Sequence, residues 1–244
     1  MTETLWEDEF RCLTFEFMER EATVIFPNER RAGNPWILKT EYFEAFPDTE
    51  RAMLRRGYCR AHLKTRERCG TRTEQEAKLA FADYLEKELG LSHRFIPIGM
   101  SCGGLQAIKL AGIAPERIAA LYLDAPVVNF WSWPFGMGDC ERDVREEQKK
   151  ELLDAYGMTM SDFIAFRDHP LDHIPTLVKN RIPVVMVYGD SDRSVPYPEN
   201  GLLLERAYRE AGLPISIFCK PGCGHHPHGM PDPEPIADLL ARCL

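Results

Sequence analysis

An apolar segment that ends in a serine between glycines constrains this chain more than any other part of its sequence. Residues 94–100 (RFIPIGM) have the composition of a buried strand, and Ser101-Cys102-Gly103-Gly104 leads from them into a helix-forming sequence. A sharp strand-to-helix turn strains its central residue and leaves no room for bulky side chains two residues to either side. Gly99 and Gly103 lack such side chains. The G-x-S-x-G pattern therefore predicts that the Ser101 hydroxyl lies at the rim of a sheet, although an ordinary glycine-rich loop would share it.

Two later strand-like segments also end in polar turns. Residues 182–188 (IPVVMVY) precede Gly189-Asp190-Ser191-Asp192, and residues 215–219 (ISIFC) precede a turn that contains His225-His226-Pro227-His228. Each polar group thus follows the C-terminal end of a predicted strand, which is the edge of an open parallel sheet where ligands bind. The order serine, acid, histidine along the chain is typical of one arrangement of the hydrolase triad.

With these motifs the chain resembles the α/β-hydrolase superfamily over nearly its whole length. The matching residues are Gly99 to Gly103, Gly189 to Asp192 with Val195-Pro196, and Gly224-His225. The segments Arg31 to Trp36, Leu123 to Pro126 and Gly224 to His228 are also similar to a bacterial branch of serine esterases that includes carbohydrate-esterase-like hydrolases. The resemblance implies an α/β fold with a mostly parallel twisted sheet, an N-terminal antiparallel hairpin, helices on both faces and a helical cap insertion.

The length and patterning predict one domain. At 244 residues the chain is long enough to bury a large core without disulfides or metals. Residues 10–17 and 21–26 predict the opening hairpin, and 73–89 predict a long amphipathic helix. Residues 130–180 depart from the alternation of strands and helices, so we expect a cap there, or else an ordinary long connection.

Composition excludes several classes of partner. The formal net charge of −8 gives no basic stripe for a nucleic acid, and no apolar run approaches the ~20 residues of a membrane span. The eight cysteines are scattered, unlike those of a small disulfide scaffold. The acidic start lacks the basic and apolar regions of a signal peptide, so we expect a reduced, cytoplasmic protein.

The candidate catalytic groups are a hydroxyl, an imidazole and a carboxylate. A serine hydroxyl such as that of Ser101 needs a base within hydrogen-bond reach to attack a carbonyl. His225 is the preferred base, with His226 as the alternative, because an imidazole both accepts and returns a proton near neutral pH. The resemblance implies Asp192 as the acid that orients the imidazole, since it stands three residues after the strand-ending glycine. Asp190 is then a turn residue, and Asp124 is a further contender for the acid.

An oxyanion formed during acyl transfer needs amide donors, and removing one typically costs about 3 to 4 kcal/mol. The amide of Cys102, just after the serine, is the first expected donor. The second is expected within residues 28–33, with Arg31 preferred. Trp36, Trp131 and Trp133 are candidate substrate-binding residues, for a sugar or an aromatic group, and equally candidates for core packing.

Three histidines within residues 225–228 raise the alternative of a zinc site. Imidazoles at adjacent positions of a short loop rarely converge, so the sequence predicts neither a metal nor another cofactor. The expected activity is hydrolysis of a small-molecule carboxylic ester with a short acyl group, including esters on a carbohydrate, through an acyl-enzyme. The alternatives are an acyltransferase or peptidase with the same triad, or a non-catalytic binding protein of this fold. The oligomeric state does not follow from these residues.

Overall fold

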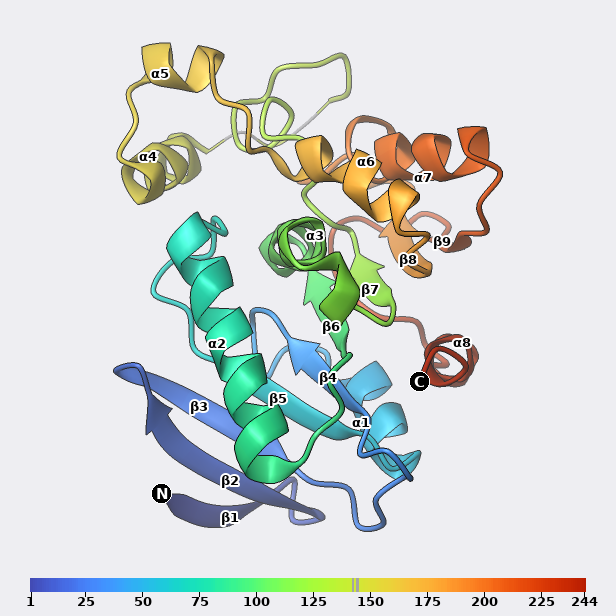
Figure 1. Cartoon of the computed structure of the whole chain (residues 1–244). Helices are drawn as coiled ribbons and strands as arrows, with labels where there is room; N and C mark the ends of the chain where they lie inside the picture. Colours follow the sequence, from blue (N-terminus) through green and yellow to red (C-terminus); the bar gives the residue numbers. More distant parts are fainter. Residues whose placement is uncertain (142, 144) are drawn as a thin grey trace.

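A nine-stranded sheet forms the centre of the computed structural model, which describes residues 1–141, 143 and 145–244 (Figure 1). In spatial order the strands are β1 (Thr2–Trp6), β2 (Phe10–Phe17), β3 (Arg20–Ile25), β5 (Cys59–Leu63), β4 (Trp36–Lys39), β6 (Ile96–Met100), β7 (Leu121–Asp124), β8 (Val184–Gly189) and β9 (Ser216–Lys220). β1, β2, β3 and β5 pair antiparallel in turn, and the pairs from β5 to β9 are parallel. The predicted mostly parallel sheet with an N-terminal hairpin is confirmed, with β1 as an additional strand.

The central strands are buried along their whole length. β4, β5, β6 and β7 have no exposed residue, as expected of parallel strands that are covered on both faces. Because these strands run in the same direction, their C-terminal ends meet at one edge of the sheet. Ser101 and the polar turns after β7, β8 and β9 all follow such an end.

Helices cover both faces of the sheet, as the resemblance implied. On one face, α2 (Arg72–Leu89), α3 (Cys102–Ile113), α6 (Pro170–Lys179) and α7 (Gly201–Glu210) contribute to the largest apolar cluster. On the other, α1 (Asp48–Arg55) and α8 (Glu234–Ala241) form a second cluster. In the described residues, short 3₁₀ turns at Pro115–Arg117 and Tyr197–Glu199 contact α3 and α7, respectively. Within the described part of the chain, every helix is too short or too polar to span a lipid bilayer.

The segment between β7 and β8 contains α4 (Glu146–Tyr156), α5 (Met160–Ile164) and α6. α6 packs on α3 and so belongs to the layer that covers the sheet. α4 and α5 lie away from the sheet, at the top of Figure 1, beyond the upper end of α2. A third apolar cluster connects this segment to the start of α3, through Phe130, Trp133, Leu152, Phe163 and Cys102. That residues 130–180 act as a cap stays a prediction.

Candidate active site

Ser101 occupies a strained position between β6 and α3. Its backbone angles, φ 52° and ψ −120°, are rarely adopted by a residue with a side chain. The surrounding chain holds it there: its amide donates to the Asp124 carbonyl at 2.9 Å, and its own carbonyl accepts from Gly104 at 2.9 Å and Val127 at 3.1 Å. Helix α3 begins at the next residue, so the turn joins strand to helix without a connecting loop.

Glycines make this turn possible. A Cβ on Gly99 would lie 2.2 Å from the Gly103 carbonyl oxygen, and one on Gly104 would lie 2.5 Å from Pro126 Cβ. At Gly103 the nearest atom would be the Thr40 Oγ1, at 3.1 Å. The expected need for small residues therefore holds most strongly at Gly99, and Gly104 is more crowded than Gly103.

Three side chains from distant parts of the sequence form one hydrogen-bonded chain. His225 Nε2 lies 3.0 Å from Ser101 Oγ, and His225 Nδ1 lies 2.7 Å from Asp192 Oδ2. The second oxygen of Asp192, Oδ1, accepts the amides of Ser194 at 2.8 Å and Val195 at 2.9 Å. With a proton on Nδ1, the imidazole donates to Asp192 and leaves Nε2 free to accept the Ser101 proton.

The two other aspartates have different partners. Asp190 Oδ1 accepts the Gly222 amide at 2.7 Å, so this exposed carboxylate joins two loops, as a turn residue would. Asp124 is buried and pairs with His228, whose Nδ1 lies 2.9 Å from Asp124 Oδ1. The Gly229 amide also donates to Asp124. The structure thus brings Asp192, and not its two alternatives, to His225.

The alternative base, His226, lies on the open side of the histidine loop. Its ring is exposed and stacks on Phe46, with the centroids 5.9 Å apart. Partial burial, with the nearby His228 and His225, lowers the pKa of His226 below the usual value of 6.5. The imidazole that reaches Ser101 is therefore that of His225.

The first expected oxyanion donor, Cys102, directly follows Ser101. Cys102 is the first residue of α3, where backbone amides have no intrahelical acceptor. Its thiol is buried, and this burial raises its pKa to about 11, so the thiol stays protonated at neutral pH. Cys102 therefore presents no thiolate at neutral pH, and the role of its amide as an oxyanion donor stays a prediction.

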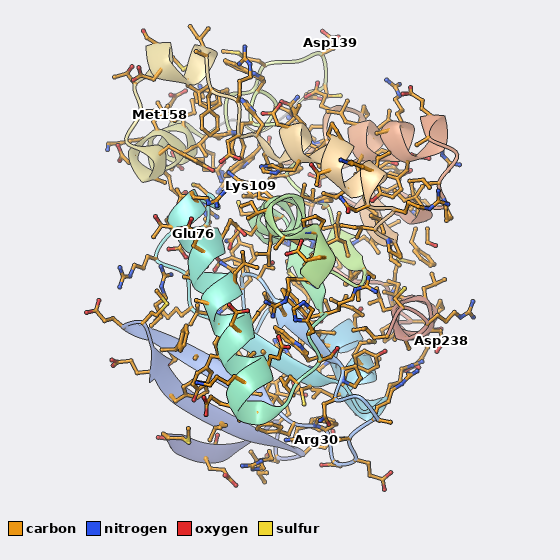
Figure 2. The ribbon with its side chains drawn as sticks, viewed as in Figure 1. Arg30, Glu76, Lys109, Asp139, Met158 and Asp238 are labelled. Atoms are coloured by element: carbon orange, nitrogen blue, oxygen red, sulfur yellow. The ribbon has the colours of Figure 1, made fainter. Side chains whose placement is uncertain are left out.

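The expected second donor, Arg31, is not near Ser101. Its amide donates to the Gly57 carbonyl at 3.1 Å, in a loop at the opposite edge of the sheet. The neighbouring Arg30 lies at the bottom of Figure 2, opposite Asp139 and Met158. The reason is strand direction: β3 runs antiparallel to β5, so the loop that follows β3 emerges where the parallel strands begin. The prediction for Arg31 is corrected on this ground.

The loop after β4, which the sequence analysis did not single out, lies at the same edge of the sheet as Ser101, because β4 runs parallel to β6. The helical spacing of residues 40–56 is interrupted at Pro47-Asp48, where a separate helix is expected to start, and α1 does begin at Asp48. Thr40 holds the preceding loop against the turn, because its hydroxyl donates to the Gly103 carbonyl at 2.8 Å. Tyr42 follows, with φ 55°, and lines the same cavity as Ser101. The one feature that identifies this loop is the place of β4 in the sheet, directly beside β6, the strand that ends at Ser101.

A cavity of about 280 Å³ opens at Ser101. Its lining includes His225, Tyr42, Arg68, Trp133, Arg145 and Gln148. Arg68 joins two sides of it, since its guanidinium donates to both carboxylate oxygens of Glu151, at 2.8 and 2.7 Å, and to the Tyr42 hydroxyl at 3.1 Å. The hydrogen bonds to Glu151 raise the pKa of Arg68 further, so this cation is permanent. Helix α4 is thereby tied to the wall of the cavity.

The three candidate tryptophans have different positions. Trp133 lines the cavity. Trp131 packs edge-on against Phe163, with the centroids 4.8 Å apart, within the third apolar cluster. Trp36 is fully buried at the start of β4, where it stacks on Phe95 and donates to the Ser92 carbonyl at 2.8 Å. Trp36 is therefore a core residue, and the expectation that it binds substrate is corrected.

Comparisons with known proteins place the fold. No protein-family model and no curated protein sequence matches the chain. Among solved structures, Est1E from Butyrivibrio proteoclasticus has a TM-score of 0.62 and 16% identity, covering 95% of this chain and 96% of that one. A puromycin hydrolase has a TM-score of 0.69 and 20% identity over 95% of this chain and 38% of that chain. Dipeptidyl peptidase 4 from Porphyromonas gingivalis has a TM-score of 0.70 and 13% identity over 96% and 35%.

These similarities show the α/β-hydrolase fold that the sequence motifs implied. At such identities they carry no further conclusion about chemistry. The first matches are also much longer proteins, since this chain spans 35% to 38% of their length.

Proposed function

We propose that this chain, which has the α/β-hydrolase fold, is a serine hydrolase with Ser101 as nucleophile, His225 as base and Asp192 as the orienting acid. The observation that carries the proposal is the continuous hydrogen-bonded chain from Ser101 through His225 to Asp192, with 3.0 and 2.7 Å between its polar atoms. Ser101 and His225 line the cavity, and Asp192 lies behind His225, in the turn after β8.

The proposed reaction has two stages. As Ser101 Oγ attacks the substrate carbonyl carbon, its proton moves to His225 Nε2, and Asp192 stabilises the imidazolium that forms. His225 then donates this proton to the leaving alcohol, and an acyl-enzyme remains. In the second stage, His225 takes a proton from water, hydroxide attacks the acyl carbon, and the proton returns to Ser101 as the acid departs.

The oxyanion that forms in each stage is proposed to lie between two donors. The Cys102 amide is one. For the second, the loop after β4 takes the place of residues 28–33, and the Tyr42 amide is preferred because Tyr42 lines the cavity beside Ser101. This amide makes a long hydrogen bond to Glu41 Oε1, at 3.4 Å, which the oxyanion would replace. Donors that are fixed in advance stabilise the developing charge without reorganisation.

An ester with a short acyl group is the preferred substrate. A cavity of about 280 Å³ is small beside ligand pockets of roughly 300 to 1,000 Å³, so it suits a small acyl group better than a long chain. Trp133 lines the cavity, so it is the proposed contact for the sugar of a carbohydrate ester. The similarity to Est1E is one of fold, and the similarity to dipeptidyl peptidase 4 is equally one of fold. These neighbours therefore do not favour ester over amide substrates.

Labelling with a fluorophosphonate probe tests the mechanism. We expect the wild-type protein to be labelled and the Ser101→Ala variant to be inert, whereas Ser92→Ala, changed at the other edge of the sheet, stays reactive. No labelling of the wild type would support a non-catalytic binding protein. Comparison of para-nitrophenyl esters of two to eight carbons with matched para-nitroanilides then tests the substrate class. If the anilides are hydrolysed faster than the esters, the enzyme is a peptidase and the ester proposal is wrong.

A further inference from the structure

Three imidazoles converge beside Ser101. The ring centroids of His225, His226 and His228 are 5.0, 4.9 and 4.9 Å apart, and the rings are close to perpendicular, at 71°, 79° and 88°. Each offers a ring nitrogen, and these three atoms lie within 4.8 Å of one another. The expectation that such close histidines would not converge is therefore wrong for this loop.

Carboxylates orient two of the three rings. Asp192 holds Nδ1 of His225, and Asp124 holds Nδ1 of His228. In both rings Nε2 is the remaining nitrogen, which is the arrangement in which carboxylates orient histidines that bind zinc. The side chains of Asp124 and His228 are each only 2% exposed, and the proposed hydrolysis uses neither. This second aspartate–histidine pair thus has no role in the reaction described above.

The spacing suits a tetrahedral metal ion. Zinc binds imidazole nitrogens at about 2.0 to 2.1 Å, which places two such nitrogens about 3.4 Å apart and their ring centres about 5 Å apart. The observed centroid distances match this geometry, while the ring nitrogens, which lie within 4.8 Å of one another, must move closer by up to about 1.4 Å to bind one ion. His226 is exposed and can make most of this movement.

We propose that His225, His226 and His228 form a Zn²⁺ site that reversibly inhibits the enzyme. The lone pair of His225 Nε2 cannot both bind the metal and accept the Ser101 proton. Zinc binding therefore replaces the hydrogen bond between His225 and Ser101 by a metal–nitrogen bond, and water or the Ser101 hydroxyl completes the coordination. The inhibitory part of this inference rests on the proposed function, whereas metal binding does not.

Titration of the metal-free protein with Zn²⁺ against a fluorescent chelator tests the site directly. We expect one ion per chain, at least tenfold weaker binding in His226→Gln, and unchanged binding in His93→Gln, where an exposed histidine elsewhere is changed. Cys223→Ser controls for the nearby thiol and should also bind normally. Co²⁺ in place of Zn²⁺ should give the visible absorption of a tetrahedral site. Absence of binding at micromolar Zn²⁺, or equal binding by His226→Gln, would overturn the site.

Ester hydrolysis measured over the same titration tests inhibition. Activity should fall with the affinity measured by the chelator and return on addition of EDTA, and the inhibition constant should rise at least tenfold in His226→Gln. Activation by zinc, or binding without inhibition, would refute the inhibitory role. Ser101→Ala should still bind zinc, so a wild-type protein that binds zinc but hydrolyses nothing would contradict the proposed function and leave the metal site standing.

Discussion

Replacing Asp192 with asparagine tests the proposed mechanism at a single hydrogen bond. Oδ1 of Asp192 accepts two backbone amides, those of Ser194 and Val195, while Oδ2 faces His225. In Asp192→Asn the carbonyl oxygen must face the two amides, so the NH₂ group points at His225 Nδ1. The imidazole then keeps its proton on Nε2 and can no longer accept one from Ser101.

The size of the activity loss depends on the cost of the other orientation of the asparagine side chain, in which its amide group is flipped. A flipped amide would restore the productive tautomer, but it would leave the Ser194 and Val195 amides facing another donor. Each unpaired amide costs about 1 to 3 kcal/mol, so the flip costs about 2 to 6 kcal/mol, or roughly 30- to 3 × 10⁴-fold in rate. The same substitution in a known Ser-His-Asp triad lowers kcat about 10⁴-fold. We therefore expect a loss of about 10³- to 10⁴-fold.

The assay is kcat/KM for para-nitrophenyl acetate at neutral pH, with circular dichroism as the check on folding. Asp190→Asn is the matched control, since it changes an exposed carboxylate in the same turn, and it should retain activity within about threefold. If Asp192→Asn folds normally and keeps more than a tenth of wild-type activity, Asp192 does not orient the base as proposed.

Three further predictions concern stability, measured as the free energy of unfolding in urea. Gly99→Ala should lose about 3 kcal/mol because its Cβ would lie 2.2 Å from the Gly103 carbonyl oxygen, and an unchanged midpoint would show that the turn is not closely packed. Lys78→Met should gain up to about 3 kcal/mol at pH 7, since burial lowers the pKa of Lys78 to about 8 and charging it there is costly; a loss would contradict this cause. Burial also lowers the pKa of His62 to about 4, so the unfolded state binds the extra proton between pH 6.5 and 4. Stability should therefore fall by about 3 kcal/mol more in the wild type than in His62→Gln as the pH drops through that window, and equal pH profiles would refute it.

Local sequence patterns determined the elements of this protein and the chemical character of its turns. The apolar runs before Ser101, Asp192 and His225 predicted strands. The polar residues that follow these runs were expected at one edge of the sheet, because the C-terminal ends of parallel strands lie together. These signals are local, because strand, turn and helix preferences act over a few residues. The need for glycine at position 99 is also local, since a Cβ there would collide with Gly103, four residues away. These signals predicted the strands, the serine turn and the polar edge, whereas the α/β-hydrolase fold and the choice of Asp192 over Asp190 came from the resemblance that these motifs support.

Tertiary structure alone decided which side chains meet. Because β3 runs antiparallel to β5, Arg31 lies at the edge of the sheet opposite Ser101, and Tyr42, in the loop after β4, lines the cavity instead. Because β4 is a central strand, Trp36 is a core residue. Packing of the histidine loop on Asp124 turned His228 toward its neighbours, so that three imidazoles gather beside one hydroxyl. These outcomes depend on strand order, strand direction and contacts between segments a hundred residues apart, and a local sequence pattern contains no information about any of them.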